Sequence, residues 1–168
     1  MKMIASADNN WAIGYDGGLL AHVPGDMRFF REKTTGNVVI LGRKTLETFP
    51  GGKPLKDREN IILTSDKNFS AEGAAVVHSV DELLEYVKKY DNDSLYVIGG
   101  ARVYAELLDY CDTAYITRFY TSFDNADAFI ENFDALEGWK LEKQSAIMEE
   151  KGIKYSFCTY VKVKEGNN

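Results

Sequence analysis

The sequence predicts an α/β domain in which a mostly parallel sheet is flanked by helices and followed by an antiparallel C-terminal hairpin. Two observations support this prediction. Short apolar runs without polar alternation, such as Val38–Leu41, are often followed by helical patterns. Such runs are typical of parallel strands that are covered on both faces. Between Lys154 and Lys164, by contrast, apolar and polar residues alternate, as in an antiparallel strand with one solvated face.

Helices are indicated by capping residues and by the spacing of apolar residues. One helix is expected to start near Pro24–Gly25. Another follows Ser79, where Glu82 completes a capping box. A third carries Arg102 and Glu106 one turn apart, so that their charges support the helix. The apolar members of these helices are Met27, Phe29 and Phe30; Val80, Leu83, Leu84 and Val87; and Val103, Leu107 and Leu108.

Strands are expected at each continuous apolar run and in the C-terminal part of the chain. The continuous runs are Val38–Leu41, Asn60–Leu63 and Leu95–Ile98. In the C-terminal part, Trp139 begins an alternating segment and Glu150–Gly152 is a turn signal. These features predict the antiparallel hairpin.

The length and composition are those of one globular domain spanning residues 1–168. A hydrophobic fraction of 45% with 12% aromatic residues excludes intrinsic disorder as the default state. The 20 Lys and Arg residues are outnumbered by 26 Asp and Glu, for a formal charge of −6. This balance argues against binding to nucleic acid and to anionic membranes. No apolar stretch approaches the roughly 20 residues that span a bilayer. A monomer is expected as the default state.

The cysteine and histidine residues do not indicate a metal site. Cys111 and Cys158 have neither the spacing of metal ligands nor the density of a disulfide scaffold. Both are expected to be small core residues of a reduced, cytoplasmic protein. His22 and His78 cannot supply a metal cluster. We therefore predict no metal.

Three of the predicted strand ends carry residues suited to phosphate. Gly99–Gly100 opens a helix, where free backbone N–H groups can meet an anion. Gly42–Thr45 adds two cations and a hydroxyl, and Thr64–Ser65 adds two hydroxyls. Taken singly, each glycine can equally serve only to turn the backbone. Together at one sheet edge they favour a dinucleotide site. Neither G-x-G-x-x-G nor a P-loop is present, so a Rossmann domain or Walker NTPase is not implied.

Asp26 is a second candidate functional residue. It lies three and four positions before Phe29 and Phe30, so on a helix its carboxylate shares the aromatic face. One interpretation is an acidic residue that stabilises the helix N-terminus. The other is a buried carboxylate with a raised pKa that binds a cationic or amidine-like heterocycle. The pattern alone leaves both open.

The chain resembles the dihydrofolate reductase family from Met3 to Lys162. The matching segments are Asn10–Gly14, Pro24–Phe30, Val39–Thr45, Arg58–Ser65, Val97–Tyr104 and Tyr115–Thr117. Their order and spacing together are specific. The resemblance implies a mixed, mostly parallel sheet of eight strands. It also implies NADPH-dependent reduction of 7,8-dihydrofolate to 5,6,7,8-tetrahydrofolate, with hydride transfer to pterin C6 and protonation at N5.

The resemblance also implies roles for individual residues. Asp26 corresponds to the pterin-binding carboxylate and Thr117 to the hydroxyl behind it, and both are expected to be catalytic. Arg58 is expected to clamp the α-carboxylate of the substrate's glutamate, a task suited to a planar guanidinium. The other residues expected to contact the substrate are Ile4, Ala5, Phe30, Leu55, Ile98 and Tyr104.

The cofactor site implied by the resemblance includes a mobile loop from Gly14 to Leu19 that closes over the nicotinamide. It also includes a cis peptide between Gly99 and Gly100. The residues expected to bind NADPH are Ser6, Ile13, Gly14, Gly17, Leu19, Gly42, Arg43, Lys44, Thr45, Thr64, Ser65, Gly99, Gly100, Ala101, Arg102, Val103 and Tyr104.

The sequence departs from the family pattern at three places. Leu20–Ala21 replaces the usual Pro-Trp, so the tryptophan that normally helps to order water near the pterin is missing. Ser6 replaces the usual alanine, and its hydroxyl is expected to face the nicotinamide carboxamide. Asp66 follows Ser65 near the expected adenosine phosphate, where a negative charge is unfavourable.

Two other functions fit parts of the pattern. The pyrimidine reductase of riboflavin synthesis shares the fold and the NADPH cradle, but Asp26 and Arg58 argue against it. A catalytically idle domain that binds a nucleotide or a partner protein is the second alternative. The presence of the carboxylate, the arginine and the phosphate-binding residues makes it the weaker one.

Overall fold

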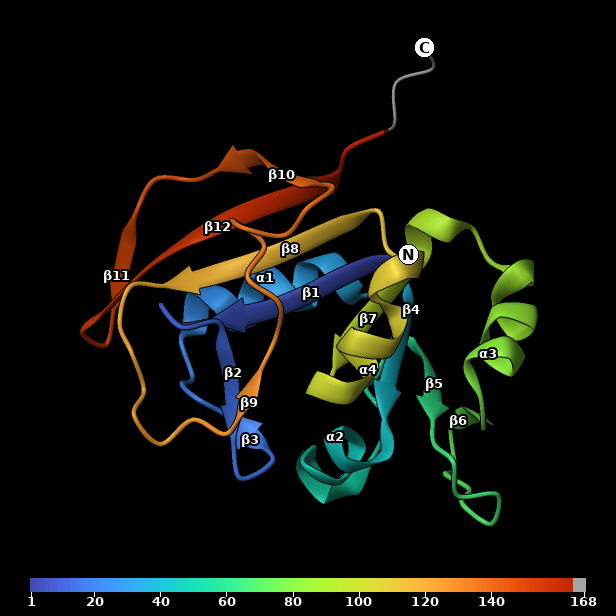
Figure 1. Ribbon diagram of the computed structural model, residues 1–168. Helices are drawn as coiled ribbons and strands as arrows, with labels where there is room; N and C mark the ends of the chain where they lie inside the picture. The colour runs from blue at the N-terminus through green and yellow to red at the C-terminus, as the bar shows by residue number, and fades with distance from the viewer. Residues whose placement is uncertain (165–168) are drawn as a thin grey trace.

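A computed structural model describes residues 1–164, and residues 165–168 of the predicted domain lie outside this range. A nine-stranded mixed sheet runs through the centre of the molecule (Figure 1). Its order is β10-β12-β8-β1-β7-β4-β5-β6, and β11 pairs with β12 as the ninth strand. The strands are β1 (Lys2–Ala7), β4 (Val38–Gly42), β5 (Glu59–Leu63), β6 (Ala74–Val77), β7 (Leu95–Gly99), β8 (Thr113–Phe119), β10 (Trp139–Gln144), β11 (Met148–Glu150) and β12 (Ile153–Lys162).

The direction of the strands confirms the predicted fold class. From β8 to β6, every neighbouring pair in the order is parallel. The C-terminal strand β12 is antiparallel to β8, β10 and β11. The turn predicted at Glu150–Gly152 joins β11 to β12, and both Lys151 and Gly152 have positive φ angles there.

Helices cover both faces of the sheet (Figure 1). The α-helices are α1 (Pro24–Thr34), α2 (Arg43–Glu47), α3 (Val80–Tyr86) and α4 (Ala101–Leu107), with 3-10 turns η1 (Pro50–Gly52), η2 (Val87–Lys89), η3 (Asn92–Ser94) and η4 (Leu108–Tyr110). The predicted helix start at Ser79 is confirmed, because its side chain accepts a 3.0 Å hydrogen bond from the Glu82 N–H. Arg102 and Glu106 form the expected pair at 2.9 Å.

The core consists of two main apolar layers, one on each face of the sheet. In β4, Val38 and Ile40 belong to the layer under α3 and α4. Val39 and Leu41 belong to the layer that also contains Phe29 and Phe30 of α1. Successive strand residues point to opposite faces, and here both faces are buried. This is why the strand sequence shows no polar alternation.

A second, smaller sheet was not predicted. It consists of β3 (Gly18–Leu19), β2 (Ala12–Tyr15) and β9 (Ala128–Phe129), in this order. The strands β2 and β3 form a hairpin, and β9 pairs with the other edge of β2. The predicted loop from Gly14 to Leu19 is therefore the turn region of a small antiparallel sheet.

Two details of the predicted elements are wrong. Met27 was expected on the apolar face of its helix, but it is 47% exposed, because it lies about 100° around the helix from Asp26. The alternating strand β12 was expected to have one solvated face, but Ser156, Cys158 and Tyr160 are buried. β12 lies inside the sheet between β8 and β10, so both of its faces are largely covered.

Candidate active site

The three strand ends predicted to bind phosphate meet at one edge of the sheet. A Cβ atom at Gly42, after β4, would lie 3.1 Å from Val103 Cγ2 and 4.0 Å from Gly99 O. A Cβ atom at Gly100 would lie 3.3 Å from the Thr45 hydroxyl oxygen. Both glycines therefore allow backbone segments to approach one another closely. The predicted cis peptide joins Gly99 to Gly100.

Cations and hydroxyls surround this junction. Arg43 and Lys44 are exposed on α2, and Arg102 is exposed on α4. Thr64 and Ser65 follow β5. Side chains of this kind can bind the phosphates of a dinucleotide by charge-assisted hydrogen bonds. The residue types and the close approach of the backbones fit a bound nicotinamide dinucleotide.

One feature of this region was only partly foreseen. Arg43 Nη1 lies 2.9 Å from Asp66 Oδ2, and Arg43 Nε lies 3.0 Å from Glu47 Oε1. The sequence pointed to Asp66 as an unfavourable charge, but it gave no sign that Asp66 would form an ion pair with Arg43. The pair brings the loop after β5 onto the first residue of α2.

Asp26 lies in the first turn of α1 and is partly buried. Burial raises the pKa of its carboxyl above the ordinary value, and the hydroxyls of Thr117 and Ser6 oppose this shift by hydrogen bonding to the carboxylate. Desolvation disfavours the charged form, whereas donated hydrogen bonds favour it. Burial and a raised pKa are features of the second interpretation left open by the sequence, and the place of Asp26 in the first turn of α1 also fits the first.

The two hydroxyls come from neighbouring parallel strands. Ser6 of β1 and Thr117 of β8 are paired in the sheet register. Residues paired in this way point to the same face, which is the face that α1 covers. Ser6 was expected to face the nicotinamide carboxamide, and its hydroxyl interacts with Asp26 in this structure.

An apolar cluster adjoins Asp26 on the α1 side of the sheet. Of the residues expected to contact the substrate, it contains Ile4, Phe30, Leu55 and Ile98. Phe49 belongs to the same cluster and was missed, because an isolated aromatic residue in a loop gives no periodic signal.

Ala5 and Tyr104 belong to the layer on the other face of the sheet. Tyr104 is nevertheless joined to the first strand, because its hydroxyl donates a 2.7 Å hydrogen bond to the Ile4 carbonyl. Burial raises the pKa of Tyr104 well above the ordinary value. Tyr104 therefore remains a neutral hydrogen-bond donor at physiological pH.

Arg58 lies at the opposite end of α1 from Asp26. Its Nη1 donates a 3.2 Å hydrogen bond to the hydroxyl of Thr34, the last residue of α1. Its Nε donates to the Lys56 carbonyl at 2.8 Å. Burial, together with the nearby cation of Arg31, lowers the pKa of Arg58, and Asp57 opposes that shift. The neighbouring positive charges of Arg58 and Arg31 favour the binding of a negatively charged ligand group.

The segment predicted to close over the nicotinamide is tied to β9. The Asp16 N–H donates to Asp127 Oδ2 at 3.0 Å, and the Asp127 N–H donates to the Gly14 carbonyl at 3.0 Å. Asp16 and Gly17, at the tip of the hairpin, have positive φ angles. Asp127 could not be identified beforehand, because it is 111 positions away from Asp16 in the chain.

Ala21, at the place of the missing tryptophan, packs beside a buried cluster of Val23, Phe119 and Tyr155. The Tyr155 hydroxyl donates a hydrogen bond to Glu150 Oε1. Through Val23, the N-cap of α1, this cluster connects the start of the helix to the hairpin of β11 and β12.

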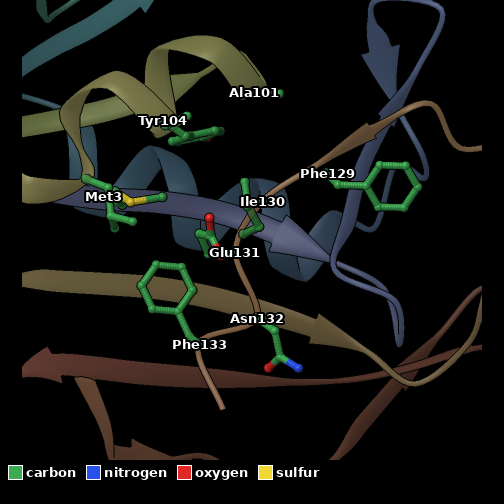
Figure 2. A pocket seen from close by; sticks show the side chains of 10 residues that line it. Met3, Ala101, Tyr104, Phe129, Ile130, Glu131, Asn132 and Phe133 are labelled. Carbon is green, nitrogen blue, oxygen red and sulfur yellow. The ribbon is translucent and has the colours of Figure 1, made fainter. Parts of the chain in front are cut away.

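A hollow of about 290 Å³ lies on the face of the main sheet opposite α1, between α4 and the segment Phe129–Phe133 (Figure 2). Met3, Tyr104 and Phe133 contribute to its walls. It also includes Ala101, so it adjoins the residues expected to bind the cofactor. The segment Phe129–Phe133 was not among the predicted site residues.

Comparisons with known proteins agree with this geometry. The family model described as dihydrofolate reductase matches residues 1–162. A dihydrofolate reductase of Bacillus subtilis is 34% identical over 164 residues, covering 96% of this chain and 94% of that protein. One from Enterococcus faecium is 39% identical over 144 residues, covering 85% and 84%.

A solved structure shows the same fold with ligands. Dihydrofolate reductase from Enterococcus faecalis, in complex with NADP(H) and RAB-propyl, matches with a TM-score of 0.84 and 36% identity. The match covers 96% of this chain and 95% of that chain.

The fold and the site define the class of protein, an α/β oxidoreductase that uses a nicotinamide dinucleotide. The chain belongs to the dihydrofolate reductase family, as its motifs predicted. Its reaction is the NADPH-dependent reduction of dihydrofolate to tetrahydrofolate. Within residues 1–164, no helix is long and apolar enough to cross a membrane.

Proposed function

We propose that dihydrofolate binds along α1, with its pterin at Asp26 and its glutamate at Arg58. The observation that carries this proposal is the placement of the two groups at opposite ends of one helix. From Asp26 to Thr34, which contacts Arg58, a helical rise of 1.5 Å per residue gives a span of about 12 Å. This length suits an extended molecule with a heterocycle at one end and a carboxylate at the other.

The apolar cluster supports the same placement. Ile4, Phe30, Leu55 and Ile98 lie in one layer with α1, between the strands and the helix. Aromatic and aliphatic walls with few polar groups are typical of small-molecule sites. In this proposal they hold the ring systems of the substrate, while Asp26 and Arg58 fix its orientation.

Asp26 has two tasks in the proposed mechanism. Its ionised carboxylate accepts hydrogen bonds from the pterin N3–H and 2-amino groups, which holds the ring and favours its protonated form. Thr117 orients that carboxylate from β8. Asp26 does not reach N5 itself, and water delivers the proton to N5. A protonated N5 makes C6 a better hydride acceptor.

The edge formed by the three strand ends is the proposed NADPH site. The side chains of Arg43, Lys44, Thr45, Ser65 and Arg102 would bind its phosphates. Gly42 and Gly100 leave room where side chains would crowd Val103 and Thr45. When bound, NADPH supplies the hydride. The remaining residues proposed at this site are Ser6, Ile13, Gly14, Gly17, Leu19, Thr64, Gly99, Ala101, Val103 and Tyr104.

Residues 1–168 are proposed to form one domain that acts as a monomer in the cytoplasm. Within residues 1–164, the exposed large apolar side chains include Tyr15, Leu19 and Phe129 of the small sheet, and the others, such as Met27 and Ile147, come from separate elements. Single exposed apolar residues do not require a partner. Cys111 and Cys158 are buried free thiols, which suits a reducing compartment. Light scattering during gel filtration tests the monomer, and a mass of two chains would contradict it.

The substrate placement is tested by comparing dihydrofolate with dihydropteroate, which lacks the glutamate. Arg58→Ala is expected to raise the KM for dihydrofolate by about one to two orders of magnitude, as for the loss of a hydrogen bond between charged groups. The KM for dihydropteroate should stay within about twofold. Exposed Lys53→Ala, on the loop before Arg58, serves as control. Equal losses with both substrates would contradict the assignment of Arg58 to the glutamate.

A further inference from the structure

The guanidinium of Arg43 is held between two carboxylates. Its Nη1 lies 2.9 Å from Asp66 Oδ2, and its Nε lies 3.0 Å from Glu47 Oε1. The group also lies over the Phe69 ring, 5.1 Å from the ring centroid. The positive charge of Arg43 is therefore partly compensated by acidic groups of the protein itself.

The carboxylate of Asp66 is fixed in place by its own turn. Asp66 Oδ1 accepts a 2.9 Å hydrogen bond from the Asn68 N–H. The Asp66 N–H in turn donates to the Thr64 hydroxyl at 3.2 Å. One carboxylate oxygen is thus used by the turn and the other by Arg43. Asp66 cannot withdraw from Arg43 without breaking a local hydrogen bond.

The ion pair is accessible to a ligand. The side chains of Arg43 and Asp66 are 43% and 40% exposed. Exposed ion pairs of this kind contribute little to stability, so a stronger anion can displace one partner. A phosphate monoester carries between one and two negative charges at neutral pH, and it would meet both the partly compensated charge of Arg43 and the negative charge of Asp66.

We propose that Asp66 is a specificity-determining residue that competes with the 2′-phosphate of NADPH for Arg43. The competition lowers the preference for NADPH over NADH, because NADH lacks that phosphate. The inference rests on the proposed NADPH site and, within it, on the assignment of Arg43, Lys44 and Ser65 to the 2′-phosphate, which they can meet with charge-assisted hydrogen bonds. It adds that Asp66, by pairing with Arg43, determines how strongly Arg43 can bind the 2′-phosphate.

The test is the affinity of the protein for NADPH and for NADH, each measured by fluorescence titration without substrate. Asp66→Asn removes the charge and keeps an oxygen that can accept from the Asn68 N–H. It is expected to tighten NADPH binding by roughly three- to tenfold, the effect of releasing Arg43 from an exposed ion pair so that it can pair with a phosphate. NADH binding should stay within about twofold.

Glu85→Gln is the matched control. Glu85 forms an exposed ion pair with Lys88 on α3 and η2, so the variant loses one charge in a similar setting. It should leave both affinities unchanged. If Asp66→Asn left NADPH binding unchanged, or tightened NADH binding equally, the role of Asp66 would be overturned.

Arg43→Ala separates this inference from the assignment on which it rests. A loss of NADPH affinity without loss of NADH affinity supports Arg43 at the 2′-phosphate, whereas equal losses overturn that assignment. In the Arg43→Ala background, the further change Asp66→Asn should no longer tighten NADPH binding by more than about twofold. A full gain in that background would show that Asp66 does not act by competing for Arg43.

Discussion

Glu150 Oε1 accepts a 3.0 Å hydrogen bond from the Gly25 N–H, although the two residues are 125 positions apart. The N-cap of α1, Val23, has no side chain that can do this. Tyr155 donates its hydroxyl to the same oxygen, and burial together with this hydrogen bond raises the pKa of Tyr155 to about 12. A Cβ atom at Gly25 would collide with both groups. The hairpin of β11 and β12 therefore caps the first turn of α1, which carries Asp26.

Glu150→Ala is expected to lower kcat/KM for dihydrofolate, because it removes the external cap next to Asp26. The loss of a cap should also destabilise the protein by about 1 kcal/mol. Glu150→Gln keeps an oxygen that accepts from the Gly25 N–H, so it should restore most of the activity. NADPH affinity should be unchanged in both variants.

Steady-state kinetics and thermal unfolding of these variants check the cap. The neighbouring exposed Glu149→Ala is the control and should behave as wild type. If Glu150→Ala unfolded at a lower temperature but kept its kcat/KM at assay temperature, the cap would be only structural.

Ser6→Ala tests whether the serine hydroxyl acts on Asp26. The hydroxyl stabilises the ionised carboxylate, so its loss should raise the apparent pKa of the hydride step. The fall of the hydride rate with pH should then occur at higher pH than in wild type. Single-turnover measurements across pH check this. Ser156→Ala removes a buried hydroxyl that contacts Tyr120 instead, and it should leave the profile in place.

The sequence predicted the strands of the parallel sheet best, because their local signal was unambiguous. Val38–Leu41 is buried on both faces, so apolar residues fill every position. In β12 the same reasoning failed, because Ser156 is polar in sequence yet buried beside Tyr120. The two-residue strand β9 is too short for any periodicity, and its partner β2 is more than 100 positions away.

The candidate site was predictable where one short segment contains the chemistry. Asp26 with Phe29 and Phe30, and the glycines at the strand ends, are such segments. The ion pair of Arg43 with Asp66 depends on how a loop folds back onto another strand end. Contacts of this kind have no local sequence signal, so only the structure identifies them.

Asp26→Asn is expected to make the folded protein more stable at pH 7. Burial raises the pKa of Asp26 above its value in the unfolded chain, so the folded state binds the proton more tightly. Stability due to this group is therefore present below the unfolded pKa and lost as pH rises through the folded one. Thermal unfolding should show an advantage of the variant that disappears as pH falls below the ordinary value of 3.8. Exposed Asp124→Asn controls for net charge, and a variant less stable than wild type at pH 7 would contradict the expectation.

The same substitution should slow hydride transfer. Asp26→Asn keeps the shape of the side chain but cannot hold the pterin in its protonated form by charge. At pH 7 the single-turnover hydride rate should fall on the order of a hundredfold, a typical effect of acid–base assistance. In wild type the rate should fall as pH rises through one apparent pKa that belongs to the site with its ligand. The variant should recover partly at low pH, where the substrate takes its proton from solvent. A near-normal rate at pH 7 would remove Asp26 from the protonation step.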